Sequence, residues 1–68
     1  MINFRSIQKG YNLDITYYKV MLDEEKYVIF AKFKDSNEVY VHKRNVDIDL
    51  VTWYFFENLI NAMEEKQL

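Results

Sequence analysis

The sequence contains no cysteine and no proline, and only one glycine and one histidine among its 68 residues. Without cysteine, the chain can form neither a disulfide nor a thiolate metal site. A zinc site built on the single histidine, His42, would need three carboxylate or water ligands, which is unusual. We therefore expect no metal and no cofactor, and a fold stabilised without cross-links.

Long apolar segments are missing as well. No run of about 18 apolar residues is present, so the sequence predicts no membrane-spanning helix. The first residues lack the basic region and apolar core of a signal peptide. Nine basic and eleven acidic residues give a net charge of −2, which is too balanced to indicate a general attraction to nucleic acids or membranes. The expected location is cytoplasmic.

Apolar and aromatic residues, in contrast, are abundant. Half of the residues are hydrophobic and 18% are aromatic, which is enough for the chain to fold rather than stay disordered. A chain of this length forms one domain, so we expect residues 1–68 to form a single compact domain. Such a domain buries only about 60% of the surface of its unfolded chain, and burial against a partner is a common source of additional stability.

The first part of the sequence has strand-like patterns. Residues 2–8 alternate imperfectly, and the sequence leaves open whether they pair with a sheet. Lys9–Gly10 then predicts a tight turn. The next run alternates from Tyr11 to Tyr17 and changes phase at Tyr18. Either a bulge near Tyr17–Tyr18 or a strand buried on both faces accounts for this change.

Two more strands follow at short spacing. Residues 23–25 are polar and predict a hairpin connection, and residues 26–34 are rich in β-branched and aromatic residues, which favours a strand. A turn signal at 35–37 precedes a strand over 38–44. These short connections favour antiparallel hairpins. In the last strand the alternation places Val39 and Val41 inward, with Tyr40, His42 and Arg44 outward.

The pattern becomes helical after these strands. From Ile48 to about Lys66 apolar residues recur at helical spacing, and Asp47 or Asp49 can cap the helix. The apolar arc, which includes Val51 and Phe55, spans roughly 200°, about twice what packing on one sheet requires; Leu50 and Tyr54 fall outside it. The sequence thus predicts an α+β fold, an antiparallel β-meander of three or four strands packed against one C-terminal α-helix.

The predicted sheet carries the same apolar surplus as the helix. One helix covers one face, yet the strands have apolar residues on both faces, whereas an uncovered face is usually polar. Either Tyr and Phe are present because they favour strands, with lysine stems covering them, or the uncovered face or the helix flank is an interface. Interfaces are enriched in Tyr, Trp, Phe, Met and Arg.

No pattern in the sequence is typical of an enzyme. His42 has Asp47 and Asp49 nearby in sequence, but an outward strand histidine beside helix-capping residues explains this arrangement without catalysis. A glycine-rich phosphate loop is excluded by the single glycine. We therefore expect a non-enzymatic protein.

The sequence favours a small protein-interaction domain that binds another protein, or a second copy in a homodimer. Its composition is typical of AT-rich genomes such as those of low-GC bacteria and their phages, so a phage-encoded inhibitor that occludes a host protein is one form of this hypothesis. The alternative is a single-stranded nucleic-acid-binding protein with an aromatic and basic sheet face. The residues expected to contact the partner are Tyr18, Phe30, Lys32, Tyr40, His42, Arg44 and Tyr54.

Overall fold

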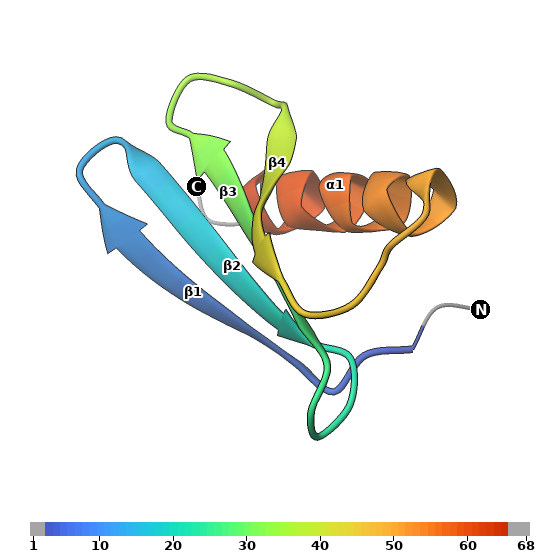
Figure 1. The fold of residues 1–68 in the computed structure, drawn as a ribbon. Helices are drawn as coiled ribbons and strands as arrows, with labels where there is room; N and C mark the ends of the chain where they lie inside the picture. The colour runs from blue at the N-terminus through green and yellow to red at the C-terminus, as the bar shows by residue number, and fades with distance from the viewer. Residues whose placement is uncertain (1–2, 66–68) are drawn as a thin grey trace.

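The structure, a computed structural model, describes residues 3–65. Its four strands form one antiparallel sheet in the order β1-β2-β3-β4, and the C-terminal helix α1 lies across one face of this sheet (Figure 1). The predicted α+β meander with a C-terminal helix is confirmed, with four strands. The elements are β1 (Ser6–Asn12), β2 (Ile15–Met21), β3 (Tyr27–Phe33), β4 (Val39–Arg44) and α1 (Leu50–Glu65).

The first hairpin differs from the sequence expectation. The predicted turn at Lys9–Gly10 is wrong, because β1 runs through both residues and pairs Gly10 with Tyr17. The turn lies at Leu13–Asp14 instead, and Leu13 has a positive φ of 55°, a conformation that glycine adopts at lower cost. The prediction followed the only glycine, whereas the pairing of the strands places a leucine in the turn.

Strand β2 explains the change of phase at Tyr17–Tyr18. Its pairing with β1 and with β3 continues through these residues without a shift, so β2 is a strand with apolar residues on both faces rather than a bulged strand. Tyr18 is fully buried on the face covered by α1, whereas Tyr17 is half-buried on the opposite face. The irregularity in the sheet lies in the β3–β4 pairing, between Ile29 and Phe30.

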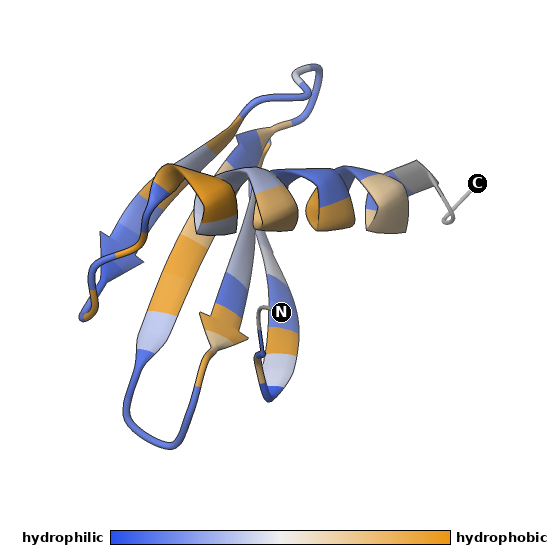
Figure 2. Cartoon of the chain, turned by 90° about the vertical axis from the view of Figure 1, so that its right-hand side faces the viewer, coloured by the Kyte–Doolittle hydropathy of each residue, from blue (hydrophilic) through white to orange (hydrophobic). Residues whose placement is uncertain are grey.

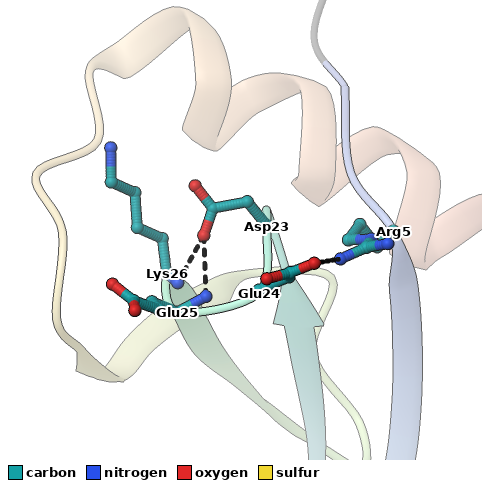
Figure 3. Close-up of polar contacts among 5 residues, drawn as sticks. All are labelled: Arg5, Asp23, Glu24, Glu25 and Lys26. Atoms are coloured by element: carbon teal, nitrogen blue, oxygen red, sulfur yellow. Dashed lines mark hydrogen bonds and ion pairs between the residues drawn. The ribbon is translucent and has the colours of Figure 1, made fainter.

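Charged side chains close the β2–β3 hairpin, as the sequence predicts (Figure 3). Asp23 Oδ1 accepts hydrogen bonds from the backbone N–H groups of Glu25 and Lys26, each at 2.8 Å, and these two bonds lower the pKa of Asp23. Arg5 Nη1 lies 3.3 Å from Glu24 Oε1. The aspartate therefore satisfies the backbone of the turn, and the ion pair joins this turn to the segment that leads into β1.

Helix α1 begins next to one of the two predicted caps. Asp49 Oδ1 accepts a hydrogen bond from the Thr52 N–H at 2.8 Å, which identifies Asp49 as the N-cap. Asp47 instead accepts a hydrogen bond from Arg44 Nη1 at 2.6 Å. The expected start of the helix at Ile48 is two residues early. The expected end at residue 66 and the start of the first segment at residue 2 lie outside the described residues.

The hydrophobic core lies between α1 and the covered face of the sheet. Phe56 and Ile60 of α1 are fully buried there, and the ring centroid of Phe30 is 5.5 Å from that of Phe56. Burial of each of these side chains stabilises the fold by about 1.5–3 kcal/mol. The fully buried apolar residues are Tyr18, Val20, Val28, Phe30, Val39, Phe56 and Ile60.

Candidate partner-binding surfaces

The face of the sheet that α1 does not cover, here called the open face, is not hydrophilic. Its rings form contacts with one another: Phe33 and Tyr40 have centroids 5.9 Å apart, and Tyr17 lies 4.9 Å from the His42 ring. The sequence expectation of apolar residues on both faces is therefore confirmed. By register and alternation, the apolar side chains on this face are Ile15, Tyr17, Met21, Tyr27, Ile29, Ala31, Phe33 and Tyr40.

Three of the residues expected on the uncovered face lie on the covered face instead. Tyr18 and Phe30 are fully buried, and Lys32 is only 8% exposed. Their placement on the open face is therefore wrong. Both sides of β3 carry apolar residues, so its composition does not identify the covered face. The register places Phe30 beside Val41 and Lys32 beside the fully buried Val39.

Tyr18 and Lys32 both have a polar end that must be accommodated on the covered face. The Tyr18 hydroxyl donates a hydrogen bond to Glu64 Oε1 of α1, so its polar end is satisfied inside the fold. Glu64 also lies 3.6 Å from Lys9 Nζ, and hydrogen bonding to Tyr11, together with the charge of Glu64, raises the pKa of Lys9. Lys32 extends its stem along the covered face, where the stem adds apolar contact to the core.

The other four predicted contact residues are exposed but do not form one surface. Tyr40 and His42 lie on β4, and their rings contact the open face. Arg44 Nη1 is engaged with Asp47 and with the Val46 carbonyl oxygen, at 2.6 and 3.0 Å, in the connection to α1. Tyr54 is exposed on α1, as its position outside the apolar arc predicts.

A shallow hollow of about 370 Å³ lies on the open face. It is bounded by Tyr17 and His42, with Lys19 and Ile29 beside them, and Gly10 contributes no side chain to fill it. Lys19 Nζ lies 5.5 Å from the Tyr27 ring centroid. Rings, a cation and open space therefore occur together on this face.

Helix α1 presents a second apolar surface to solvent. Leu50, Val51, Tyr54 and Phe55, here called the helix stripe, are 62, 71, 57 and 38% exposed. The first turn of the helix is coloured as strongly hydrophobic (Figure 2). Sequence analysis places Leu50 and Tyr54 outside the apolar arc, and both are exposed. Val51 and Phe55 belong to the arc and are exposed as well, because the arc is wider than the sheet can cover. The sheet covers the side of α1 that carries Phe56 and Ile60, so the remainder of the wide apolar arc is left exposed.

The open face and the helix stripe meet at the edge of the sheet, in a notch of about 390 Å³ between β4 and α1. Tyr40 and Tyr54 both line it, so the structure brings these two predicted contact residues together. Glu38 and Glu57 line the same notch, and sequence reasoning did not select them. The available signal was the spacing of Glu57, which follows Trp53 by four residues and Tyr54 by three and so lies beside them on the helix.

Residues 3–65 contain neither a cluster of metal-ligating side chains nor a helix suited to span a membrane. Within this range no three His, Cys, Asp or Glu side chains gather closely enough to hold a metal ion. Over the same range no helix is both long enough and apolar enough to cross a membrane.

Comparison with known proteins adds no functional information to this geometry. No protein-family model matches the sequence, and neither a curated protein nor a solved structure shows significant similarity to it.

Proposed function

We propose that this protein is a non-enzymatic protein-interaction domain that binds its partner through the helix stripe. The observation that carries the proposal is the exposure of four large apolar side chains along one side of a short helix, with no charged residue among them. Contiguous apolar surface of this kind is typical of interaction sites, and an amphipathic helix docks such residues into a groove of its partner.

The spacing of the stripe supports this mode of binding. Leu50, Val51, Tyr54 and Phe55 stand at positions i, i+1, i+4 and i+5, so they lie along one side of the helix. The opposite side of α1 is occupied by the core residues Phe56 and Ile60, so docking of the stripe leaves the fold intact. Tyr is one of the residues that most often dominate binding energy, which makes Tyr54 the expected anchor.

The proposed action is stoichiometric. Bound through its helix, a domain of 68 residues would occlude a functional surface on a larger protein in the cytoplasm, which is the action of an inhibitor. The phage origin considered above would make that larger protein a host enzyme. A second copy of the chain is the other candidate partner for the helix stripe.

A pair of matched variants tests the proposal. Val51→Lys places a charge in the centre of the stripe at no cost in helix propensity, whereas Glu25→Lys makes a charge change in the exposed β2–β3 hairpin. The partner is first trapped by photo-crosslinking from position 51, then purified and titrated by calorimetry, and sedimentation gives the solution mass of the protein alone. We expect Val51→Lys to weaken partner binding, or self-association, by about tenfold or more, with no change for Glu25→Lys.

Two outcomes would contradict the proposal. One is wild-type binding by Val51→Lys. The other is a protein that remains monomeric at high concentration and yields no crosslinked partner from position 51. A dimer that Val51→Lys dissociates would identify the partner as a second copy.

A second candidate function, binding of single-stranded nucleic acid, is favoured by the charge of the open face. By register, the residues of β1–β4 that point to this face include Lys19 and Lys43 and no carboxylate. Exposed rings beside a cationic track bind unpaired bases by stacking. The acidic residues of the chain lie in the hairpins and on or near α1, so the net charge of −2 does not describe this face.

A gel-shift titration with a labelled oligothymidylate tests this second function. The affinity should fall steeply as salt rises, and Tyr17→Ala with Lys19→Ala should weaken it while Val51→Lys leaves it unchanged. Absence of a shift at low salt would eliminate the nucleic-acid function.

A further inference from the structure

The notch between β4 and α1 has a composition suited to one class of group. Its lining residues are Glu38, Val39, Tyr40, Trp53, Tyr54 and Glu57. Three are aromatic and two are carboxylates, and within the described part of the chain neither lysine nor arginine lines it. It therefore combines π-electron surface with negative charge.

Hydrogen bonds between α1 and the residues around β4 hold the notch in shape. Trp53 Nε1 donates to the Val39 carbonyl oxygen at 2.8 Å, and Asn61 Nδ2 donates to the Asn37 carbonyl oxygen at 3.0 Å. The first of these bonds ties the indole to an edge strand, and the second anchors the helix two turns further on. The Trp53 indole and the backbone of β4, which form part of the notch wall, are thus joined directly, which limits the entropy lost on binding.

The two carboxylates differ in how they are satisfied. Glu38 Oε2 accepts a hydrogen bond from the Tyr40 hydroxyl at 2.9 Å, and this bond, together with the negative charge of Glu38, raises the pKa of the Tyr40 phenol. Glu57 is half-buried, and among residues 3–65 it has neither a hydrogen bond nor an ion pair. A half-buried carboxylate without a partner would be stabilised by a cation placed beside it.

We propose that the β4–α1 notch binds a cationic side chain, arginine or lysine, of the partner protein. A cation over aromatic rings is attracted by their quadrupoles, and the two carboxylates add a Coulombic contribution of the same sign. An anion would face Glu38 and Glu57 without a compensating cation. A purely apolar group would leave the Glu57 carboxylate desolvated and unpaired.

This assignment rests on the proposed function and specifies the chemistry of the partner. Tyr54 belongs both to the helix stripe and to the notch, so one docked segment can reach both. Over its described length, helix α1 carries Glu57, Glu64 and Glu65 and no basic residue, and Glu57 lies beside Tyr54, so a carboxylate borders the stripe. The partner should therefore present apolar residues to Leu50, Val51 and Phe55 and a basic residue to the notch.

The test uses the whole protein and two short peptides that differ in charge alone. Acetyl-Gly-Arg-Gly-amide is the probe, and the same peptide with neutral citrulline in place of arginine is its control. Trp53 is the only tryptophan in the chain, so its indole N–H gives a unique NMR signal inside the notch. We expect the arginine peptide to shift this signal saturably, with an affinity about three- to fivefold above that of the citrulline peptide, as an exposed ion pair provides.

Two variants locate the effect. Glu57→Gln should remove most of the preference for arginine, because it deletes the carboxylate charge that lines the notch and preserves the shape of the side chain. Glu25→Gln in the β2–β3 hairpin should leave the preference unchanged. Equal shifts by the two peptides, or no saturable shift by either, would overturn the proposal, and because this comparison uses wild-type protein it does not depend on the folding of a variant.

Failure of this proposal is distinguishable from failure of the proposed function. Val51 does not line the notch, so the effect of Val51→Lys on the partner and the peptide preference of the wild-type protein are separate measurements. If the peptides are not discriminated but Val51→Lys still abolishes partner binding, the interaction function stands and the cation site falls. If the arginine peptide binds but Val51→Lys has no effect on the partner, the helix stripe is rejected and the notch alone remains as a site.

Discussion

The covered and the open faces of the sheet have similar side chains in very different surroundings. Tyr17 and Tyr18 are adjacent in β2, yet Tyr18 is fully buried with its hydroxyl bonded to Glu64, whereas Tyr17 is half-buried against His42. Phe30 lies in the core, and Phe33, three residues later, is exposed on the open face. Since strand side chains alternate between faces, a shift of one residue in register would exchange these roles.

This contrast shows that residue type alone does not distinguish core from interface in so small a protein. The covered face is identified by complete burial and by polar atoms that find partners within the fold. The open face is identified by rings that contact one another and leave space above them. Substitutions that are matched across the two faces therefore measure what the helix contributes to stability.

Truncation of a core ring should have the largest effect. Phe30→Ala removes a fully buried side chain that contacts Phe56, and we expect a loss of about 3–5 kcal/mol, a large part of the free energy of unfolding of a domain of marginal stability. Phe33→Ala on the open face should cost about 1 kcal/mol or less, because Phe33 already faces solvent. Urea denaturation followed by Trp53 fluorescence compares the two. Equal losses would mean that the open face is also covered in solution, as in a dimer.

Removal of a single hydroxyl sharpens the comparison of the two tyrosines. Tyr18→Phe deletes the hydrogen bond to the Glu64 carboxylate and should cost about 1.5 kcal/mol. Tyr17→Phe removes a hydroxyl that has no hydrogen bond within residues 3–65 and should change stability by less than about 0.5 kcal/mol. Thermal denaturation of the two variants under the same conditions checks the difference. A larger effect at Tyr17 would assign the covered face to the wrong tyrosine.

The sequence predicts the elements of this fold better than it predicts their faces. Alternation, turn residues and helical spacing located β3, β4 and α1, and Asp49 was one of two predicted caps. The strand predicted from Tyr11 covers β2 but also includes the end of β1 and the turn between them. The turn at Leu13–Asp14 was missed because Asn12 and Asp14, although they favour turns, also fit the polar positions of an alternating strand, whereas Gly10 gives a turn signal that the strand pairing overrides. Local chemistry therefore identifies elements, and non-local pairing decides where they turn.

The candidate sites were harder to predict for the same reason. Tyr18, Phe30 and Lys32 lie in strands that carry apolar residues on both faces, and the sequence does not encode which face meets the helix. Tyr40 and Tyr54 were selected one at a time for their exposure. Their meeting in one notch with Glu38 and Glu57 depends on the angle at which α1 crosses β4, and periodicity carries no information about that angle.

Substitution of Asp49, the N-cap of α1, should have a smaller effect on stability, and this effect should depend on pH. It tests how the helix that covers the core is held at its N-terminus. The backbone N–H of Thr52, followed by its hydroxyl, lowers the pKa of Asp49 in the folded protein. Ionised Asp49 therefore contributes stability that is fully present above the unfolded-state pKa of about 3.9 and is lost as pH falls through the lower folded-state value. Asp49→Asn keeps an acceptor at the cap and should abolish this part of the acid dependence. Hydrogen exchange should show faster opening at Thr52 and Trp53 in Asp49→Ala and no change in β1; equal acid profiles for wild type and Asp49→Asn would contradict the assignment.

The smallest effect concerns an apolar residue that belongs to neither face. Leu13 is 97% exposed at the tip of the β1–β2 hairpin and has a φ of 55°, so its side chain contributes nothing to the core while its backbone conformation is unfavourable for leucine. Leu13→Asn should stabilise the protein by about 0.5–1 kcal/mol, because asparagine enters this conformation more readily. Gly10→Ala is the matched control in the same hairpin, since φ is negative there and a Cβ would meet nothing within 4 Å; it should be neutral or slightly stabilising. If Leu13→Asn destabilises the protein instead, the leucine side chain is buried in solution, and the tip of the hairpin joins the open face as part of the surface that a partner or a second copy covers.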